Sequence, residues 1–116
     1  EFTGAELLPK YADNRKHRTR LEALVLSMAK AAGAAEFVNQ WRALEQRPDS
    51  WCTLRQITCP TLILCGVNDN LCSVELHREM AAEISGGQLQ IIADAGHLCT
   101  LDAPIAVNRA LHRWLG

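Results

Sequence analysis

The sequence has 116 residues, enough for one compact domain, and 48% of them are hydrophobic and 22% charged, as in an ordinary globular protein. Twelve basic residues against thirteen acidic ones leave a formal net charge of -1, so no strong field attracts nucleic acid or an anionic membrane. No apolar run approaches the roughly 20 residues of a membrane span, and we expect neither kind of partner.

The N-terminus and the cysteines bear on the compartment. The sequence begins at Glu1 rather than Met, which suggests a processed or excised piece, and its first residues show no secretory signal. The five cysteines are odd in number and form no C-x-x-C pair, which favours reduced thiols in the cytoplasm over disulfides or a zinc site; they are Cys52, Cys59, Cys65, Cys72 and Cys99.

Residues 1–55 read as a helical segment. Apolar residues recur at helical spacing from residue 21 and predict a buried face, which Gly33 would end; they are Leu21, Leu24, Val25, Met28 and Ala32. A second short helix is predicted after it, with Phe37, Val38, Trp41 and Leu44 on one side. The polar run Arg47–Ser50 then breaks the pattern.

Residues 56–116 read as β-α-β-α. A continuous apolar run, Pro60–Cys65, predicts a strand covered on both faces, and a second strand is predicted over Leu89–Ile92. Ser73 can cap the helix between them, which should stop at Gly86–Gly87. Asp102 and Pro104 should open a final helix whose inward face is Val107, Leu111, Trp114 and Leu115.

A strand, a helix and a strand in this order predict a right-handed parallel crossover. Two parallel strands alone leave both sheet edges open, whereas parallel pairs normally lie inside larger sheets. We therefore expect an incomplete α/β fold that takes strands from a partner or a second copy, or one that the helical segment wraps.

Asp69 and His97 are the residues that point most directly to chemistry. Each follows a predicted strand by a few residues, and the carboxyl ends of parallel strands meet at one edge of the sheet. A carboxylate there can accept the imidazole N–H while the second nitrogen takes a proton from a nucleophile. The alternative is that Asp69 only forms a turn and His97 is a structural histidine.

These residues stand in a pattern that resembles the C-terminal portion of the α/β-hydrolase superfamily. The pattern is Cys59–Asp69, followed by Ala95-Gly96-His97 and Leu101–Pro104. The resemblance implies that Asp69 is the triad acid and His97 the triad base, in the order that this fold uses. It also implies that the helices of residues 1–55 resemble the end of a cap domain, and it implies no metal and no organic cofactor.

The sequence departs from the superfamily at the nucleophile, because it contains no G-x-S-x-G elbow. Ser27 lies inside a predicted amphipathic helix with no glycine on either side, and Cys72 and Cys99 lie close in sequence to Asp69 and His97. None of the three matches the elbow, so the sequence predicts half of an active site.

Two functions remain open at this point. In the first reading, the chain is the C-terminal half of a serine-type, esterase-like hydrolase. It would supply Asp69 and His97, be inactive alone, and act on an ester-like small molecule when a nucleophile-bearing half is present. Its cap-like helices would then line the pocket with Met28, Phe37 and Trp41, whose alternative is ordinary helix packing. The second reading is a truncated, non-catalytic homo-oligomer that binds a small molecule or a partner.

Overall fold

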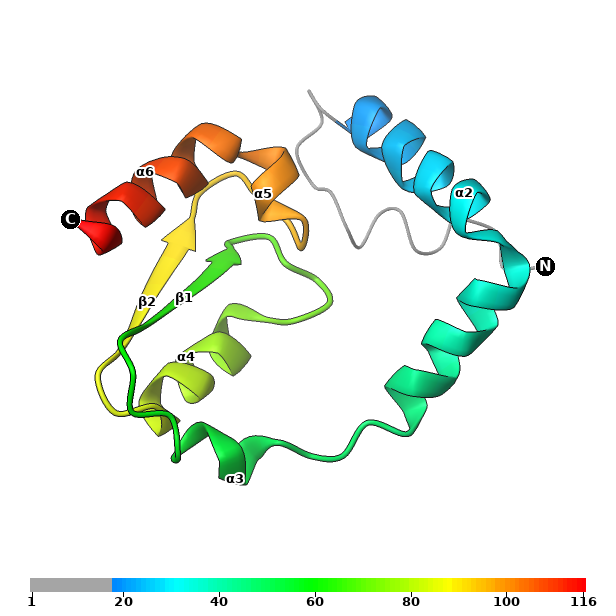
Figure 1. Cartoon of the computed structure of the whole chain (residues 1–116). Coiled ribbons are helices and arrows are strands. Elements are labelled where there is room, and N and C mark those ends of the chain that lie inside the picture. The colour runs from blue at the N-terminus through cyan, green and yellow to red at the C-terminus, as the bar shows by residue number, and fades with distance from the viewer. Residues whose placement is uncertain (1–17) are drawn as a thin grey trace.

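The computed structural model describes residues 18–116. Helix α2 (Arg18–Glu45) and the short helix α3 (Trp51–Leu54) come first. They are followed by strand β1 (Thr61–Gly66), helix α4 (Val74–Glu83) and strand β2 (Gly87–Ile92). The chain ends with the short helix α5 (Cys99–Asp102) and helix α6 (Pro104–Leu115) (Figure 1). The predicted β-α-β-α order after a helical segment is confirmed.

The two strands pair in parallel, from Thr61 opposite Gly87 to Gly66 opposite Ile92. Strand β2 begins two residues earlier than predicted, because Gly87 leaves the turn at Gly86 directly in extended pairing with Thr61. Ser73 caps α4 as predicted, and its hydroxyl accepts from the backbone N–H of Leu76 at 3.2 Å. Among residues 18–116 the sheet has these two strands.

The core lies between the strands and the helices on either side of them. Helix α4 contacts both strands and α6 contacts β2, and in Figure 1 the strand pair lies between these two helices. Small and β-branched side chains let the last helices approach β2 closely. The buried cluster on that side consists of Ile92, Ala95, Cys99, Val107 and Ala110.

The predicted inward face of the last helix is partly wrong. Val107 is buried, but Leu111 and Leu115 are exposed. Ala110 is buried in their place, so the contact with β2 is made one residue earlier on the helix than the larger leucine suggested. Pro104 does stand in the first turn of α6, whereas the Asp102 carboxylate accepts no capping hydrogen bond from that helix.

Helix α2 departs furthest from its predicted packing. Its two arms meet at Gly33, which has a φ of 81° and interrupts the helix where the predicted stop lies. Leu21 is buried, but most of the remaining predicted inward face is exposed, including Leu24, Phe37 and Leu44. The physical reason is visible in Figure 1, where both arms of α2 run along the side of the molecule away from the sheet. The apolar periodicity predicted the helix correctly and its burial incorrectly.

The division of the chain at residue 55 remains a prediction. Arg55 forms an ion pair with Glu83 of α4, so a contact joins the two predicted segments at that point. No helix among the described residues is long and apolar enough to cross a bilayer.

Candidate active site at the carboxyl ends of the strands

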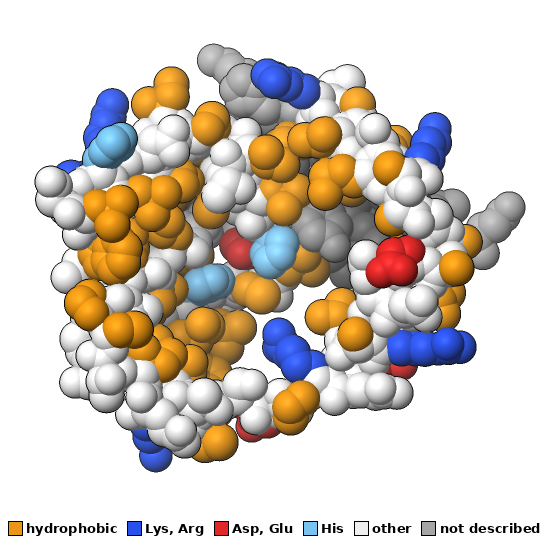
Figure 2. Space-filling model, in the orientation of Figure 1, with side chains coloured by type: hydrophobic (Ala, Val, Ile, Leu, Met, Phe, Trp, Pro, Cys, Tyr) orange, Lys and Arg blue, Asp and Glu red, His pale blue; other side chains and the backbone are white. Residues whose placement is uncertain are grey.

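The loops that follow β1 and β2 leave the sheet at the same edge, because the strands are parallel and end opposite one another. Asp69 lies in the first loop and His97 in the second. In the orientation of Figure 1, histidine and acidic side chains gather at a hollow near the middle of the face shown in Figure 2, where the strands end. The fold therefore brings together two residues 28 positions apart in sequence.

Asp69 is held by its own loop. Its Oδ1 accepts hydrogen bonds from the backbone N–H groups of Leu71 and Cys72, each at 2.9 Å. Its own N–H donates to the carbonyl of Gly66 at 3.2 Å. Such a turn is what an Asn-Asp-Asn sequence favours, so the turn-forming role that the sequence offered for Asp69 is real. It orients the carboxylate toward the second loop and does not compete with a chemical role.

His97 lies within hydrogen-bonding distance of this carboxylate. Its Nδ1 is 3.0 Å from Oδ2 and 3.2 Å from Oδ1 of Asp69. The Asp69 side chain is 4% exposed and that of His97 is 33% exposed. If Nδ1 carries the proton donated to Asp69, Nε2 has the lone pair that can accept a proton. The buried Asp69 carboxylate thus faces a more accessible imidazole, an arrangement in which a carboxylate can orient a base.

Asp69 is an ionised carboxylate at neutral pH. Burial opposes its charged form, but the backbone N–H of Cys72, the His97 imidazole and the backbone N–H of Leu71 together outweigh burial, so the pKa of Asp69 is lowered. An ionised carboxylate in this position can favour one tautomer of the imidazole and stabilise an imidazolium.

The loop that carries His97 is fastened to the loop after β1. The Asn68 N–H donates to the carbonyl of Ala95 at 2.9 Å, and the Val67 N–H donates to the carbonyl of Ile92 at 2.9 Å. Gly66 lies against the same loop, because a Cβ there would overlap the carbonyl oxygens of Ala95 and Gly96. The close approach of the two backbones sets the separation of the acid and the base.

Asp102 also contacts the loop that carries His97, and the sequence did not reveal this contact. Its side chain is buried, and its Oδ2 accepts a hydrogen bond from the backbone N–H of Gly96 at 2.8 Å. The sequence signal was present, in an acidic residue six positions after Gly96 and two before Pro104, but that position is also typical of a helix start. Only the structure shows that the carboxylate turns back to the histidine loop.

The other nucleophile candidates lie in less reactive settings. Ser27 is on the exposed surface of α2. Cys99 is buried, and burial raises the pKa of its thiol, as it does for Cys65. Cys72 takes part through its backbone N–H to Asp69. The part of the chain from residue 18 onward holds no group of three or more side chains suited to a metal ion.

The three candidate substrate-contacting residues are all on α2. Met28 is 60% exposed, Phe37 40% and Trp41 44%, and the indole N–H of Trp41 donates to Glu45 at 3.1 Å. Their contact with a substrate remains a prediction. All three side chains are partly covered, so ordinary helix packing stays the alternative for them.

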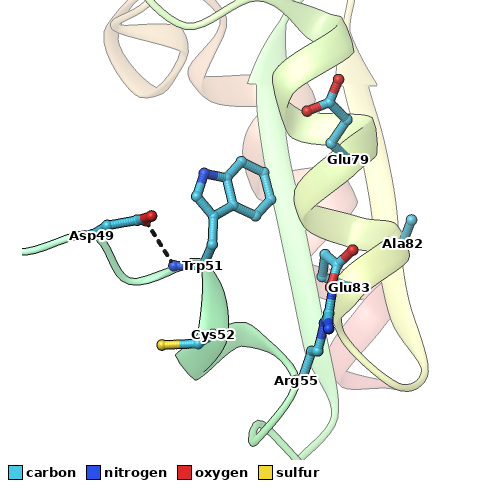
Figure 3. Close-up of a pocket in the computed structure, with 7 residues that line it drawn as sticks. All are labelled: Asp49, Trp51, Cys52, Arg55, Glu79, Ala82 and Glu83. Atoms are coloured by element: carbon cyan, nitrogen blue, oxygen red, sulfur yellow. Dashed lines mark hydrogen bonds and ion pairs between the residues drawn. The ribbon is translucent and has the colours of Figure 1, made fainter.

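A cavity of about 630 Å³ lies away from the acid–base pair, between α3 and α4 (Figure 3). Asp49 accepts from the Trp51 N–H at 3.0 Å, and Arg55 is paired with Glu83. This ion pair lowers the pKa of Glu83. The remaining lining residues are Cys52, Glu79 and Ala82. Neither Asp69 nor His97 lines this cavity, so it is separate from the candidate active site.

No family model matches the sequence. Individual known proteins are similar to this chain, and those described below are hydrolases or peptidases. A curated hydrolase of (E)-2-((N-methylformamido)methylene)succinate from Acinetobacter baylyi is 34% identical over 67 residues, which are 58% of this chain and 24% of that protein. A proline iminopeptidase from Levilactobacillus brevis is 28% identical over 97 residues, 78% of this chain and 32% of that protein.

A solved thermophilic esterase from Thermogutta terrifontis superposes with a TM-score of 0.77 and 29% identity, over 97% of this chain and 42% of the esterase. The chain thus spans about a quarter to two-fifths of the length of these proteins. Nearly all of this chain has a counterpart in the esterase, while more than half of the esterase has none in this chain.

Proposed function

Since the chain belongs to the α/β-hydrolase superfamily and matches only part of its relatives' length, we propose that Asp69 and His97 are the acid and base of a serine-type hydrolase site. The nucleophile would lie on a segment that this sequence does not contain. The observation that carries the proposal is the 3.0 Å contact between a buried, ionised Asp69 and the more accessible His97 at the strand ends.

The proposed reaction begins with His97. Asp69 holds the proton on Nδ1, so that Nε2 accepts the proton of a serine hydroxyl as the oxygen attacks the carbonyl carbon. The imidazolium then gives that proton to the leaving group, and Asp69 stabilises the positive charge throughout without taking the proton. Water repeats the sequence on the acyl intermediate.

The proposed substrate is a small ester-like molecule. This rests on the similarity to the Thermogutta terrifontis esterase over almost the whole chain, and the Levilactobacillus brevis relative is a peptidase, which cleaves a related bond. Met28, Phe37 and Trp41 are proposed to contact the apolar part of the substrate, since their exposed side chains give α2 an apolar surface.

The proposed partner is a nucleophile-bearing segment that completes the sheet. Strand β1 pairs with β2 on one edge, and within residues 18–116 no strand lies on its other edge. A parallel strand there would also place its own carboxyl end beside Asp69 and His97. The second candidate is a non-catalytic homo-oligomer, in which another copy covers the strand edge and the apolar side chains of α2.

Hydrolysis of a short-chain p-nitrophenyl ester tests the proposal. The chain would be assayed alone and mixed with the nucleophile-bearing part of the Thermogutta esterase, expressed separately. We expect turnover in the mixture that His97→Ala reduces to background and that His112→Ala, an exposed histidine on α6, leaves unchanged.

Two outcomes would contradict the proposal. Turnover that survives His97→Ala would assign the chemistry elsewhere. A mixture in which the segments bind one another and remain inactive, beside a stable dimer of this chain in light scattering, would favour the non-catalytic oligomer.

A further inference from the structure

We propose that Asp102 is a positioning residue for His97, acting through the backbone of Gly96. The inference rests on the proposed function, because it gives Asp102 a task only if His97 is a base oriented by Asp69. It concerns the contact from α5 to the histidine loop, which is independent of the hydrogen bonds that hold Asp69.

The first observation is the burial of an incompletely satisfied carboxyl group. Asp102 is 5% exposed. Its Oδ2 accepts from the Gly96 N–H at 2.8 Å, whereas its Oδ1 is buried and has no hydrogen-bond partner among residues 18–116. A buried polar atom without a partner costs roughly 1–3 kcal/mol, and such atoms in native proteins call for an explanation. An apolar residue would fill this position at a lower cost if the position served packing alone.

The second observation is where the satisfied oxygen points. The Gly96 N–H belongs to the residue directly before His97. On the other side of the same loop, Asn68 donates to Ala95 at 2.9 Å and Gly66 lies against the Ala95 and Gly96 carbonyls. Asp102 therefore holds the loop from the α5 side while the β1 loop holds it from the sheet side.

The third observation is the rigidity of the platform that carries Asp102. Its own N–H donates to the Leu98 carbonyl at 2.9 Å, and Ala103 donates to Cys99 at 2.9 Å. Cys99 belongs to the buried cluster with Val107 and Ala110. The carboxylate is thus fixed to the core through α5, and the hydrogen bond to Gly96 transmits that fixed position to the backbone of His97.

Nuclear magnetic resonance of the full chain tests the inference without requiring turnover. The readouts are the His97 Nδ1–H signal, which reports the contact with Asp69, and the amide signals of β1 and β2, which report folding. Asp102→Ala removes the acceptor. Asp102→Asn keeps one carbonyl oxygen for the Gly96 N–H, and Thr100→Ala changes an exposed neighbour on α5.

We expect Asp102→Ala to speed exchange of the His97 Nδ1 proton by about tenfold or more, the equivalent of one lost hydrogen bond to a charged group, while the strand amides keep their dispersion. Asp102→Asn and Thr100→Ala should leave the signal in place. An unchanged His97 signal in folded Asp102→Ala would overturn the inference.

Two further measurements separate the possible failures. If Asp102→Ala does not fold, hydrogen exchange of the Gly96 amide in the unmodified chain decides, because an amide that exchanges as fast as that of exposed Asn70 would overturn the inference. Asp69→Asn should itself abolish the Nδ1–H signal. If it does not, the acid–base pair of the proposed function is wrong, whatever Asp102 does.

Discussion

The region from β1 to α6 and the helix α2 both contain apolar residues that the sequence predicts to be buried, but they bury their side chains to very different extents. The first region contains the buried residues Ile63, Cys65, Ile84, Ile92, Ala95, Cys99, Val107 and Ala110, whereas in α2 the buried hydrophobic residue is Leu21. The comparison shows that apolar spacing identifies a face that is favourable to bury. It does not indicate whether another part of the same chain packs against that face.

The two regions also differ in how their glycines are used. Gly33 in α2 has open space around the position of a Cβ, so its positive φ shapes the bend of α2 and involves no contact with another element. Gly66 has the backbone of the histidine loop directly against it. The site therefore depends on the tertiary packing of the β1–α6 region, and stability in that region and the geometry of the site should change together.

The largest expected effect is a loss of stability when a buried side chain beneath the strand ends is shortened. Ile92→Ala removes a side chain that is 3% exposed and should lower the free energy of unfolding by about 2–5 kcal/mol. The matched change in α2, Leu44→Ala, removes a side chain that is 62% exposed and should cost about 0.5 kcal/mol or less. Denaturant titration of both variants measures the contrast, and equal losses would show that the two regions are equally well packed.

A methyl group at Gly66 should come next. Gly66→Ala forces the loops of Asp69 and His97 apart, with an expected cost of about 1–3 kcal/mol from overpacking. Gly33→Ala meets no neighbouring atoms, but its φ of 81° and ψ of 165° are essentially restricted to glycine, so the backbone alone should cost about 1–3 kcal/mol. The sharper readout is the His97 Nδ1–H signal, which Gly66→Ala should weaken and Gly33→Ala should leave unchanged. If Gly66→Ala keeps the His97 Nδ1–H signal, the distance between Asp69 and His97 does not depend on the close approach of Gly66 to the histidine loop.

The dependence of stability on pH is a smaller effect and is confined to the site. The pKa of Asp69 is lowered in the folded chain, so its ionised form stabilises the fold above the ordinary pKa of about 3.9, and this contribution is lost as the pH falls through the lower folded value. The stability difference between the unmodified chain and Asp69→Asn should therefore shrink as the pH falls below about 4.

The control for this profile is Glu36→Gln, which removes an exposed carboxylate from α2. Thermal unfolding between pH 3 and 7 provides the measurement. A difference between Asp69→Asn and the unmodified chain that stays constant down to pH 3 would mean that Asp69 is not stabilised in its charged form.

The smallest expected effect is at the candidate substrate-contacting residues. Met28→Ala should change the free energy of unfolding by less than about 0.5 kcal/mol, since the side chain is 60% exposed. In an assembled hydrolase, the same change should raise KM more than it lowers kcat, because it removes binding area rather than the reacting groups. A large loss of stability from Met28→Ala in the chain alone would instead assign this side chain to packing.

The sequence by itself determined the order of elements and predicted that Asp69 and His97 meet at the strand ends. The signals are local: a continuous apolar run predicted β1, the Ser73 cap and the glycines at 86–87 bounded the following helix, and a short apolar segment after them predicted β2. The positions of Asp69 and His97 after those strands predicted their contact, because parallel strands bring their carboxyl ends to one edge whatever their side chains are. Their role as acid and base stays a prediction that rests on the resemblance to the superfamily.

The tertiary structure alone decided which apolar faces are covered and how the histidine loop is held. Three features depend on the distances between elements that are remote in sequence. They are the burial of Ala110 in place of Leu111, the exposure of α2, and the hydrogen bond from the Gly96 N–H to Asp102. Helical periodicity gives the direction of a side chain on its own element but carries no information on how close the neighbouring element lies.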